Sequence, residues 1–434
     1  MPTPPTRTPL RMSADRRYLV DADGRPFFFL ADTNWTIVWK GEAEQWSTFL
    51  DLRQKQGFSL LQVNLLPWRW EMTDVEGNRP FHDGNPDRPN EAYFARFDRF
   101  FEMAAERGLV SCLMLIWGGP RPQLPAVHFS TKQAVRFATW AVRRFGKYPM
   151  IWSLSGDAPY EEELEKWEAV GDAVEKADTF AHPTTNHLPP HSNWRALHHT
   201  STWHDFHMIQ TGHTRRSIDD IAALPTSYYA KEPTKAFVNG EPWYEAHPSR
   251  DVRAIYGPVF TAEEQRYAFW VSMLSGATMG HTYGSQGVWN WKRAGDDETE
   301  MAGPQIGPTW NEAMHHPGAR QIALGVDFLR TVDWWRLRPC PERVVLTLAS
   351  TRPDRRAFCA HIPGELYIAY RPANSTGQIV LKGLEGDSWS ASWLDPRTGE
   401  ISPIGSIQFD PARMWTAPPV PSADDWVIVA RTGE

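Results

Sequence analysis

The chain has 434 residues, enough for one large domain and one small one. Its formal net charge of −7 argues against a nucleic-acid partner, which needs a basic face. No apolar run reaches the roughly 18 residues that a membrane-spanning helix requires, so no membrane partner is expected. Aromatic residues are abundant, with 22 Trp, 21 Phe and 12 Tyr, which suits either a large buried core or flat platforms for sugar rings.

The N-terminal residues 1–15 are rich in Pro, Thr and Arg and predict a loose arm. They lack the apolar stretch of a secretory signal, which favours a cytoplasmic location, with a trimmed signal as the alternative. Three cysteines, Cys112, Cys340 and Cys359, are too few for a disulfide framework, although the last two could be neighbours. Residues 17–20 and 23–26 then predict a hairpin.

From residue 27 the chain alternates between short apolar runs and amphipathic stretches. The apolar runs predict buried strands at residues 27–30, 60–66, 109–117, 150–154, 181–187, 205–210, 236–238 and 276–284. Helical spacing predicts helices at residues 46–56, 94–107, 132–145, 161–177, 217–224, 262–275 and 321–329. This alternation predicts a (β/α)8 TIM barrel over residues 16–338. A doubly wound open sheet is the alternative, but residues 31–35 are not the Gly-rich phosphate loop typical of such folds.

After about residue 340 the helical spacing ends. Short apolar runs alternate with turn residues and predict strands at residues 344–348, 357–361, 366–370, 378–381, 389–394 and 426–430. This pattern is typical of a small β-sandwich, so residues 339–434 are expected to form a C-terminal β domain. The short Pro-rich joint at residues 338–341 favours a domain that is fixed against the barrel.

Two carboxylates follow buried strands of the predicted barrel. Asp157 comes after the fourth strand and Glu241 after the seventh, and each stands in a Gly-acid sequence followed closely by proline. Catalytic residues of TIM barrels lie at the carboxyl ends of the strands. A pair of carboxyl groups, one protonated and one ionised, suits cleavage of a glycosidic bond. The alternative is that either acid caps the helix that follows its strand.

Motifs at the ends of several strands resemble those of the apiosidase-like glycoside hydrolases, which include glycoside hydrolase family 140. The resemblance rests on residues 29–35 (Phe-Leu-Ala-Asp-Thr-Asn-Trp), 64–68 (Asn-Leu-Leu-Pro-Trp), 152–157 (Trp-Ser-Leu-Ser-Gly-Asp), 210–213 (Gln-Thr-Gly-His) and 239–245 (Asn-Gly-Glu-Pro-Trp-Tyr-Glu). Residues 393–400 and 425–426 resemble the small collagen-binding-like β domain that follows the barrel in that group.

The resemblance implies a retaining glycoside hydrolase with Asp157 as the acid/base and Glu241 as the nucleophile. Known members act on terminal furanose sugars, such as apiose, in plant polysaccharides. Many members have an acidic or small residue where Ala158 stands, so the tuning of the site can differ here. Many are also secreted, so the lack of a signal in this chain leaves a small intracellular glycoside as a plausible substrate.

Further polar and aromatic residues end the predicted strands, where sugar hydroxyls need donors, acceptors and an aromatic floor. For each of them a structural hydrogen bond is the alternative to sugar contact, and Asp32 stands out because a buried carboxylate needs a partner. The candidate substrate-binding residues are Asp32, Asn34, Trp35, Asn64, Trp68, Trp117, His187, Gln210, His213, His281 and Tyr283.

Histidines are frequent between residues 182 and 213, which raises the question of a metal site. The chain has neither a His-x-His pair after the first strand nor a His-Glu-x-x-His motif, so neither a metal nor a cofactor is expected. A metal-dependent hydrolase therefore stays an alternative of lower rank. A second alternative is an inactive carbohydrate-binding or scaffold protein. The sequence does not fix the oligomeric state.

Overall fold

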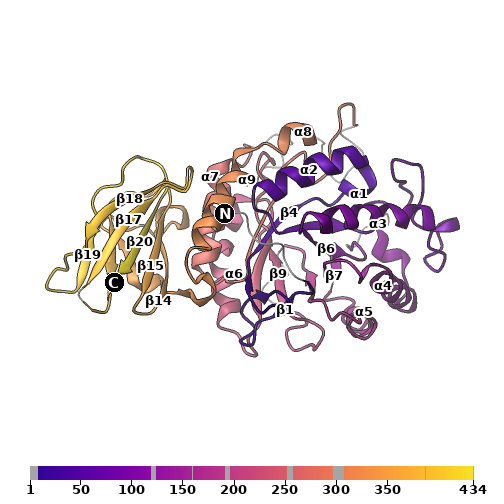
Figure 1. The fold of residues 1–434 in the computed structure, drawn as a ribbon, viewed down its shortest axis with the longest axis horizontal. Helices are drawn as coiled ribbons and strands as arrows, with labels where there is room; N and C mark the ends of the chain where they lie inside the picture. Colours follow the sequence, from indigo (N-terminus) through magenta and orange to yellow (C-terminus); the bar gives the residue numbers. More distant parts are fainter. Residues whose placement is uncertain are drawn as a thin grey trace.

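The barrel predicted from the alternating pattern is present in the computed structural model, which describes residues 8–118, 124–158, 160–190, 196–251, 258–296, 307–386 and 388–433 (Figure 1). Among these residues, parallel strands close in the order β10-β11-β4-β5-β6-β7-β8-β9. They are β4 (Phe29–Thr33), β5 (Leu60–Asn64), β6 (Val110–Met114), β7 (Met150–Gly156), β8 (Thr184–His187), β9 (Phe206–Gln210), β10 (Ala236–Glu241) and β11 (Gly280–Tyr283). The TIM-barrel prediction is confirmed.

Helices surround the barrel in Figure 1. They are α1 (Ile37–Lys40), α2 (Ala43–Lys55), α3 (Glu91–Glu106), α4 (Thr131–Phe145), α5 (Leu164–Ala177), α6 (Asp220–Tyr229), α7 (Ala262–Leu274), α8 (Trp310–Ala313) and α9 (Pro317–Leu329). Helix α4 shows how local sequence sets a boundary. The Ser130 hydroxyl accepts a hydrogen bond from the Gln133 backbone, and the Gln133 side chain accepts one from the Ser130 backbone.

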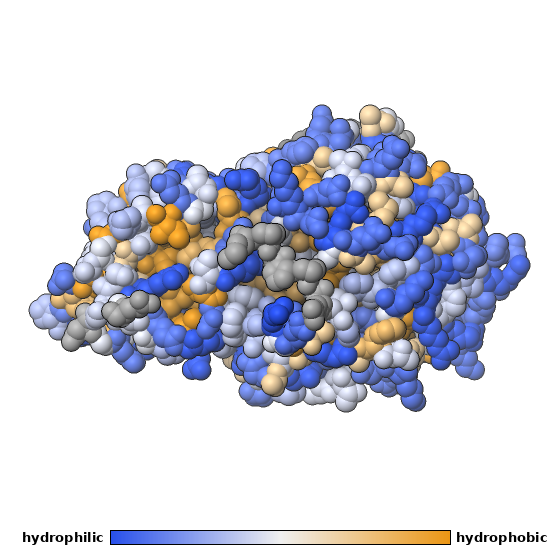
Figure 2. All heavy atoms as spheres, in the orientation of Figure 1, coloured by the Kyte–Doolittle hydropathy of each residue, from blue (hydrophilic) through white to orange (hydrophobic). Residues whose placement is uncertain are grey.

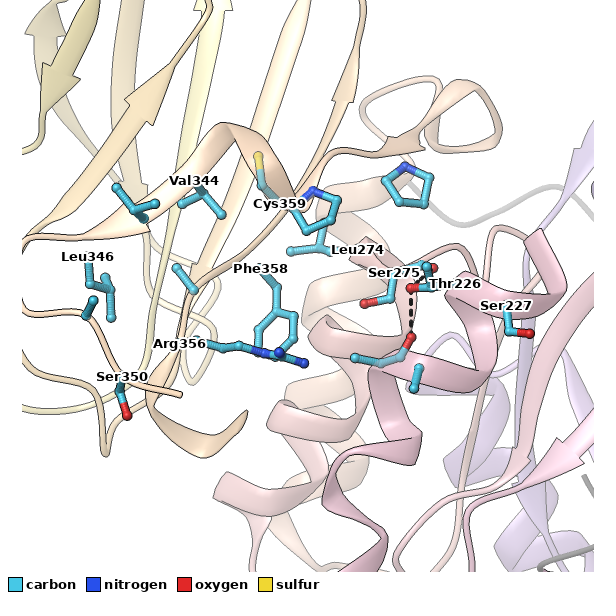
Figure 3. A pocket seen from close by; sticks show the side chains of 17 residues that line it. Thr226, Ser227, Leu274, Ser275, Val344, Leu346, Ser350, Arg356, Phe358 and Cys359 are labelled. Atoms are coloured by element: carbon cyan, nitrogen blue, oxygen red, sulfur yellow. Dashed lines mark hydrogen bonds between the residues drawn. The ribbon is translucent and has the colours of Figure 1, made fainter. Parts of the chain in front are cut away.

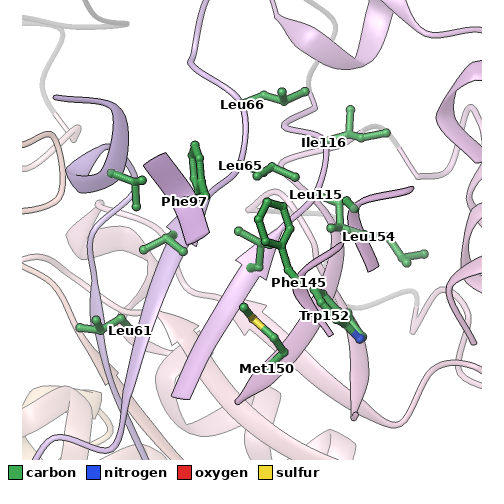
Figure 4. Close-up of a cluster of buried hydrophobic side chains, with 14 of the residues drawn as sticks. Leu61, Leu65, Leu66, Phe97, Leu115, Ile116, Phe145, Met150, Trp152 and Leu154 are labelled. Atoms are coloured by element: carbon green, nitrogen blue, oxygen red, sulfur yellow. The ribbon is translucent and has the colours of Figure 1, made fainter. Parts of the chain in front are cut away.

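Side chains alternate between the two faces of each barrel strand. Inward-facing residues form a cluster in the barrel interior that includes Phe29, Leu60 and Met208. Outward-facing residues pack against the helices, as Trp152 and Leu154 of β7 do against the cluster that contains Phe97 of α3 (Figure 4). This parity decides which side chains at the ends of the strands reach the interior.

Residues 8–15 differ from the loose arm expected over residues 1–15, of which residues 1–7 lie outside the described part of the chain. Leu10 is fully buried, and β1 (Arg11–Met12) pairs with β2 (Leu19–Val20), which in turn pairs with β3 (Pro26–Phe27). The predicted hairpin is therefore extended to three strands. Phe27 belongs to this small sheet, so the first barrel strand begins at Phe29 rather than Phe27. A continuous apolar run carries no signal that separates the two strands.

The C-terminal residues form the predicted β domain. Within the described residues, one sheet has the order β12-β14-β15-β20-β17-β18 and a second has β13-β16-β19, with a buried apolar cluster drawn from both. The strands are β12 (Arg338–Pro339), β13 (Val344–Leu346), β14 (Phe358–Ile362), β15 (Leu366–Arg371), β16 (Ile379–Lys382), β17 (Trp389–Leu394), β18 (Ile401–Ser406), β19 (Met414–Thr416) and β20 (Trp426–Thr432). Strands β12, β18 and β19 were not predicted, because β12 is very short and β18 has little buried apolar surface.

The β domain packs against helix α7 of the barrel. The guanidinium of Arg266 donates two hydrogen bonds, of 2.9 and 2.6 Å, to the carboxylate of Asp425, and both side chains are buried. The Tyr370 hydroxyl donates a third to the same carboxylate at 3.2 Å. In Figure 2 the surface over α2 and α3 is mostly hydrophilic, while apolar side chains show on the β domain near its boundary with the barrel. No helix among the described residues is long and apolar enough to cross a membrane.

Candidate active site

The carboxylates of Asp157 and Glu241 lie at the same rim of the barrel. Asp157 directly follows β7, Glu241 ends β10, and the strands are parallel, so their carboxyl ends meet at one rim. A register shift between Asn239 and Glu241 pairs Glu241 with Gln210 of β9. Because of this bulge, Glu241 faces the interior, whereas the Asn239 amide faces Ser272 of α7 at 3.4 Å.

Asp157 adopts a backbone conformation that few residues tolerate. Its φ is +50°, in the left-handed region, where Asp and Asn are among the better-tolerated side chains. Its carboxylate accepts a hydrogen bond of 2.5 Å from the Gln210 amide. Helix α5 begins only at Leu164, and Glu163 occupies its N-cap position. The carboxylate of Asp157 is therefore not a helix cap, and local strain of this kind is common at functional sites.

Two buried histidines contact the carboxylates. The Nε2 of His187 lies 3.2 Å from Glu241 Oε2, and its Nδ1 lies 3.7 Å from Asp157 Oδ1. On the other side, His213 Nε2 donates to Glu241 Oε1 at 2.9 Å. One imidazole thus bridges both acids, and the second holds Glu241 from the far side.

These contacts drive the two acids toward opposite protonation states. Burial and the nearby charge of Glu241 raise the pKa of Asp157 to about 6. Burial also acts to raise the pKa of Glu241, but hydrogen bonds and charge from His187 and His213 outweigh it and hold that pKa well below its usual range. The pKa of His187 is raised despite its burial, because Glu241 and Asp157 stabilise the imidazolium. At neutral pH the pair comprises an ionised Glu241 beside an acid of raised pKa.

A ring of aromatic side chains, which we call the aromatic collar, packs against the two histidines that contact the acids. It consists of Trp35, Trp117, Trp68, Trp289 and Tyr244. Ring centroids are 5.2 Å apart for Trp35 and Trp117, 4.3 Å for Trp117 and Trp68, 6.2 Å for Trp68 and Trp289, and 6.3 Å for Trp289 and Tyr244. The Trp35 indole closes the circle by donating to the Tyr244 hydroxyl at 3.2 Å. Trp68 and Trp289 are partly exposed, so they form its outer side.

Two glycines let the collar pack directly on the backbone. A Cβ at Gly156 would lie 2.1 Å from the Trp117 ring, and one at Gly284 would lie 2.0 Å from the Tyr244 ring. Real Cβ atoms do not come this close to other atoms, so only glycine fits at either place. Gly156 therefore positions both Asp157, which follows it, and Trp117 across from it.

Several buried polar atoms near the rim have no hydrogen-bond partner within the described part of the chain. They include both amide atoms of Asn34 and of Asn64, the Trp68 indole nitrogen and His213 Nδ1. Buried polar groups are normally paired, so unpaired groups call for an explanation. Hydroxyl-rich ligands supply the donors and acceptors that such groups lack.

Three of the candidate substrate-binding residues lie on the outer face of the barrel. Asp32 is fully buried and pairs with Arg53 of α2. The Tyr283 hydroxyl donates to Glu245 at 2.6 Å, and the His281 ring lies against Phe269 of α7, with centroids 5.5 Å apart. The parity of β4 and β11 points these side chains away from the interior. Their polar groups serve the packing of strands against helices, and this placement argues against sugar contact.

The other candidates converge on the rim. Trp35, Trp68 and Trp117 form the collar, His187, Gln210 and His213 hold the carboxylates, and Asn64 follows the inward parity of β5. Sequence reasoning missed Tyr244, Trp289 and His247, the last of which stacks on His213 with centroids 4.4 Å apart. Tyr244 lies within the motif at residues 239–245, so the sequence contained a signal that could have identified it. Trp289 lies in a loop after β11, and no sequence motif marks it.

The clustered histidines do not converge on an ion. Among the described residues, no three or more His, Cys, Asp or Glu side chains are arranged to hold a metal. His199 Nδ1 instead contacts His207 Nε2 at 2.9 Å, and His198 pairs with Glu168 at 2.6 Å. His191 lies outside the described residues.

Comparison with known proteins agrees with this fold. A family model described as "Apiosidase-like, catalytic domain" matches residues 13–336, and one described as "Putative collagen-binding domain of a collagenase" matches residues 340–431. A solved structure titled a glycoside hydrolase superposes with a TM-score of 0.86 at 21% identity, covering 98% of this chain and 97% of the other. A glycoside hydrolase family 5 structure from Bacteroides vulgatus ATCC 8482 gives 0.85 at 22% identity, with coverages of 98% and 93%. No curated protein matches.

The family match over the barrel identifies the class of protein as a glycoside hydrolase. The chain belongs to the apiosidase-like family, whose catalytic-domain model covers the barrel. The likeness to the solved structures is below 25% identity and shows the shared fold.

Proposed function

We propose that this enzyme is a retaining, exo-acting glycosidase that removes a terminal furanose sugar such as apiose from a plant-derived glycoside or oligosaccharide. The observation that carries the proposal is the opposite tuning of two carboxyl groups that contact one imidazole. Retaining enzymes hold their carboxyl groups about 5 to 5.5 Å apart. His187 contacts both carboxylates, so the two acids share one site, and the anomer of the released sugar tests whether the mechanism is retaining.

In the first step Glu241, ionised, attacks the anomeric carbon and forms a glycosyl ester. The bond to the leaving oxygen breaks as Asp157 donates its proton to that oxygen. His187 and His213 hold Glu241 ionised and oriented, because both contact its carboxylate oxygens. Asp157 suits proton donation, because its pKa of about 6 keeps part of it protonated near neutral pH.

In the second step Asp157, now ionised, takes a proton from water. The water oxygen attacks the anomeric carbon, the ester bond to Glu241 breaks, and the sugar leaves with its original anomeric configuration. The same carboxyl group thus acts first as acid and then as base. Its side chain is 36% exposed, against 10% for Glu241, so Asp157 is the more accessible of the two to water and to a leaving group.

The aromatic collar is the feature that favours action on a single terminal sugar. Its rings run in contact from Trp35 through Trp117, Trp68 and Trp289 to Tyr244, and a closed ring of this kind suits one sugar unit better than a chain lying across it. In this proposal aromatic faces pack against the C–H faces of the sugar, and the Asn64 amide, which is buried without a partner in the described part of the chain, bonds its hydroxyls. The match to the apiosidase-like family supports a furanose. A panel of nitrophenyl furanosides and pyranosides tests this choice, and faster hydrolysis of every pyranoside would contradict it.

Substrates with good and poor leaving groups distinguish the roles of the two acids, because only proton donation depends on the basicity of the leaving oxygen. Glu241→Ala should lose activity on every substrate, because no ester forms without the nucleophile. Asp157→Ala should fail on alkyl glycosides yet release dinitrophenol in a burst, because dinitrophenolate leaves without protonation. Added azide should then restore turnover in the Asp157 variant by attacking the ester. The measurement is stopped-flow release of dinitrophenol with and without azide.

Equal loss on good and poor leaving groups in Asp157→Ala, with no burst, would remove Asp157 from the acid/base role. Asp157→Asn is the matched variant, since Asn also tolerates the left-handed backbone at this position. It should reproduce the burst. A wild-type protein that binds sugars but hydrolyses no aryl glycoside would favour the inactive carbohydrate-binding alternative.

A further inference from the structure

Cys340 and Cys359 lie directly opposite each other where the barrel joins the β domain. Strands β12 and β14 are antiparallel and pair Pro339 with Ala360, so Cys340 continues this register opposite Cys359. The backbone amide of Cys340 donates to the carbonyl of Cys359 at 2.9 Å. Directly opposed residues in antiparallel strands have Cα atoms about 4.5 to 5.5 Å apart, within the range that a disulfide bridges.

The two thiols also point toward each other. Their sulfur atoms are 3.4 Å apart, and both side chains are 1% exposed. Each cysteine packs in the apolar core of the β domain, and no metal-binding group of three or more ligands exists among the described residues. A short inward movement of either sulfur would bring the pair to bonding distance, about 2.05 Å. The third cysteine, Cys112, lies in the barrel interior with no thiol beside it.

A cavity at the joint between the domains reaches Cys359. It has a volume of about 560 Å³ and lies between the β domain, helix α6 and the end of α7, with Cys359 among its lining residues (Figure 3). Leu346 and Phe358 supply apolar wall, and the Arg356 guanidinium supplies a positive charge. A cavity of this size is comparable to small-molecule sites and admits a compact reagent.

We propose that Cys340 and Cys359 are a thiol–disulfide exchange site that reacts with a low-molecular-weight disulfide entering through this cavity. The sulfur of Cys359 attacks one sulfur of the small disulfide, releases one small thiol and forms a mixed disulfide. Cys340 then attacks the Cys359 sulfur and displaces the second small thiol. The two protein thiols lose two electrons and two protons, and the small disulfide gains them as two thiols.

The resulting bond would tie the interdomain joint to strand β14. The two cysteines are 19 positions apart, so the bond closes a short loop that includes β13 and restricts the unfolded chain. Ser275, at the cavity edge, follows α7 and precedes β11. The cavity therefore lies at the end of the barrel opposite the carboxylate rim, and glycosidase activity should not change when the bond forms.

The test is to incubate the full-length protein, purified under reductant and then freed of it, with oxidised glutathione at mildly alkaline pH. Burial and the neighbouring Cys340 raise the pKa of Cys359, so a high pH and long incubation favour reaction. We expect intact mass to show loss of two hydrogens and peptide mapping to show a Cys340–Cys359 cross-link with Cys112 free. The melting temperature should rise by several degrees, and reductant should reverse the rise.

Matched variants make each outcome decisive. Cys340→Ser should stop at a stable glutathione adduct on Cys359, and Cys112→Ser should cross-link like the wild type. The inference is overturned if wild-type Cys359 keeps its glutathione or if both thiols remain free in the folded protein. Cross-linking of Cys112 to either partner would overturn it as well, since that bond requires unfolding.

Discussion

At the scale of single residues, the surroundings of each acid set its pKa more than its residue type does. Asp157 lies near the charge of Glu241, and this repulsion adds to burial in raising its pKa. Glu241 is less exposed, but the imidazoles of His187 and His213 both contact its carboxylate. Their hydrogen bonds and charge lower its pKa by more than burial raises it. A pair of titratable groups pushed in opposite directions is a general mark of an acid and a nucleophile.

The pH dependence of kcat/KM should reflect this tuning. The first step needs Asp157 protonated, and its pKa is raised to about 6, so activity should fall as pH rises through about 6. Glu241 must be ionised, and because its pKa is held well below the usual range, activity should persist below pH ~4.3, where an ordinary Glu becomes protonated. The measurement is kcat/KM on an aryl glycoside with a poor leaving group. An alkaline limb above pH 8 would contradict the assignment.

His187 should act as a positioning residue for the nucleophile. His187→Gln removes a charge 3.2 Å from Glu241, so the pKa of Glu241 should rise and the acidic limb of kcat/KM should move to higher pH. We expect kcat to fall about 10²-fold, the usual effect of losing one buried donor to a reacting group.

His281→Gln is the matched control for His187→Gln. His281 is an equally buried histidine of a barrel strand, but it packs against Phe269 on the outer face. It should leave both limbs of the pH profile in place. A shift of the acidic limb in His281→Gln as large as that in His187→Gln would mean that the profile reports general loss of structure.

At the scale of elements, the Asp32–Arg53 ion pair connects strand β4 to helix α2. Both side chains are fully buried, and Arg53 also donates to the Met314 carbonyl at 2.8 Å. A charge left alone in such a place is costly, because the interior solvates it poorly. The Asp32–Arg53 ion pair therefore holds α2 against the barrel.

Asp32→Asn should lower the free energy of unfolding by about 3 to 5 kcal/mol, because it leaves the Arg53 charge unpaired. KM of the folded enzyme should not change, since Asp32 faces away from the rim. Urea unfolding and steady-state kinetics on the same preparation check both statements. A several-fold rise in KM with unchanged stability would restore Asp32 as a sugar contact.

At the scale of the whole molecule, the β domain is held to the barrel by an apolar face with a buried ion pair at its edge. Trp270 of α7 stacks on Tyr370 of β15 at 6.4 Å between centroids, and Arg266 binds Asp425 beside them. Within the described residues of the β domain, no carboxylate contacts the active-site acids. We expect the domain to stabilise the barrel without taking part in the reaction.

Asp425→Asn should destabilise the protein by about 3 to 5 kcal/mol, because Arg266 stays buried without its partner. The adjacent Asp424→Asn is its control. Asp424 is 46% exposed and pairs with Arg397 at the surface, so its loss should cost at most about 1 kcal/mol. Thermal melts of the two variants should differ clearly, while kcat stays unchanged in both. Equal melting temperatures would contradict a structural role for the interdomain pair.

The sequence alone determined the barrel, the β domain and the two acids. Hydrophobic periodicity is a local property, so runs such as Leu60–Asn64 and Met150–Gly156 mark their strands without any knowledge of neighbours. Parallel strands place their carboxyl ends at one rim, so the sequence alone predicts that Asp157 and Glu241 lie at the same rim. Their placement follows from local pattern and from one topological rule.

The tertiary structure alone decided which side chains serve the site. The bulge at Asn239–Glu241 determines which way the Glu241 side chain points, and strand parity directs Asp32, His281 and Tyr283 outward. The bond from Trp35 to Tyr244 joins residues 209 positions apart, and no local pattern encodes such a contact. The protonation of each acid likewise depends on burial and on partners from other strands. These quantities belong to the packed molecule, because desolvation and charge act through space rather than along the chain.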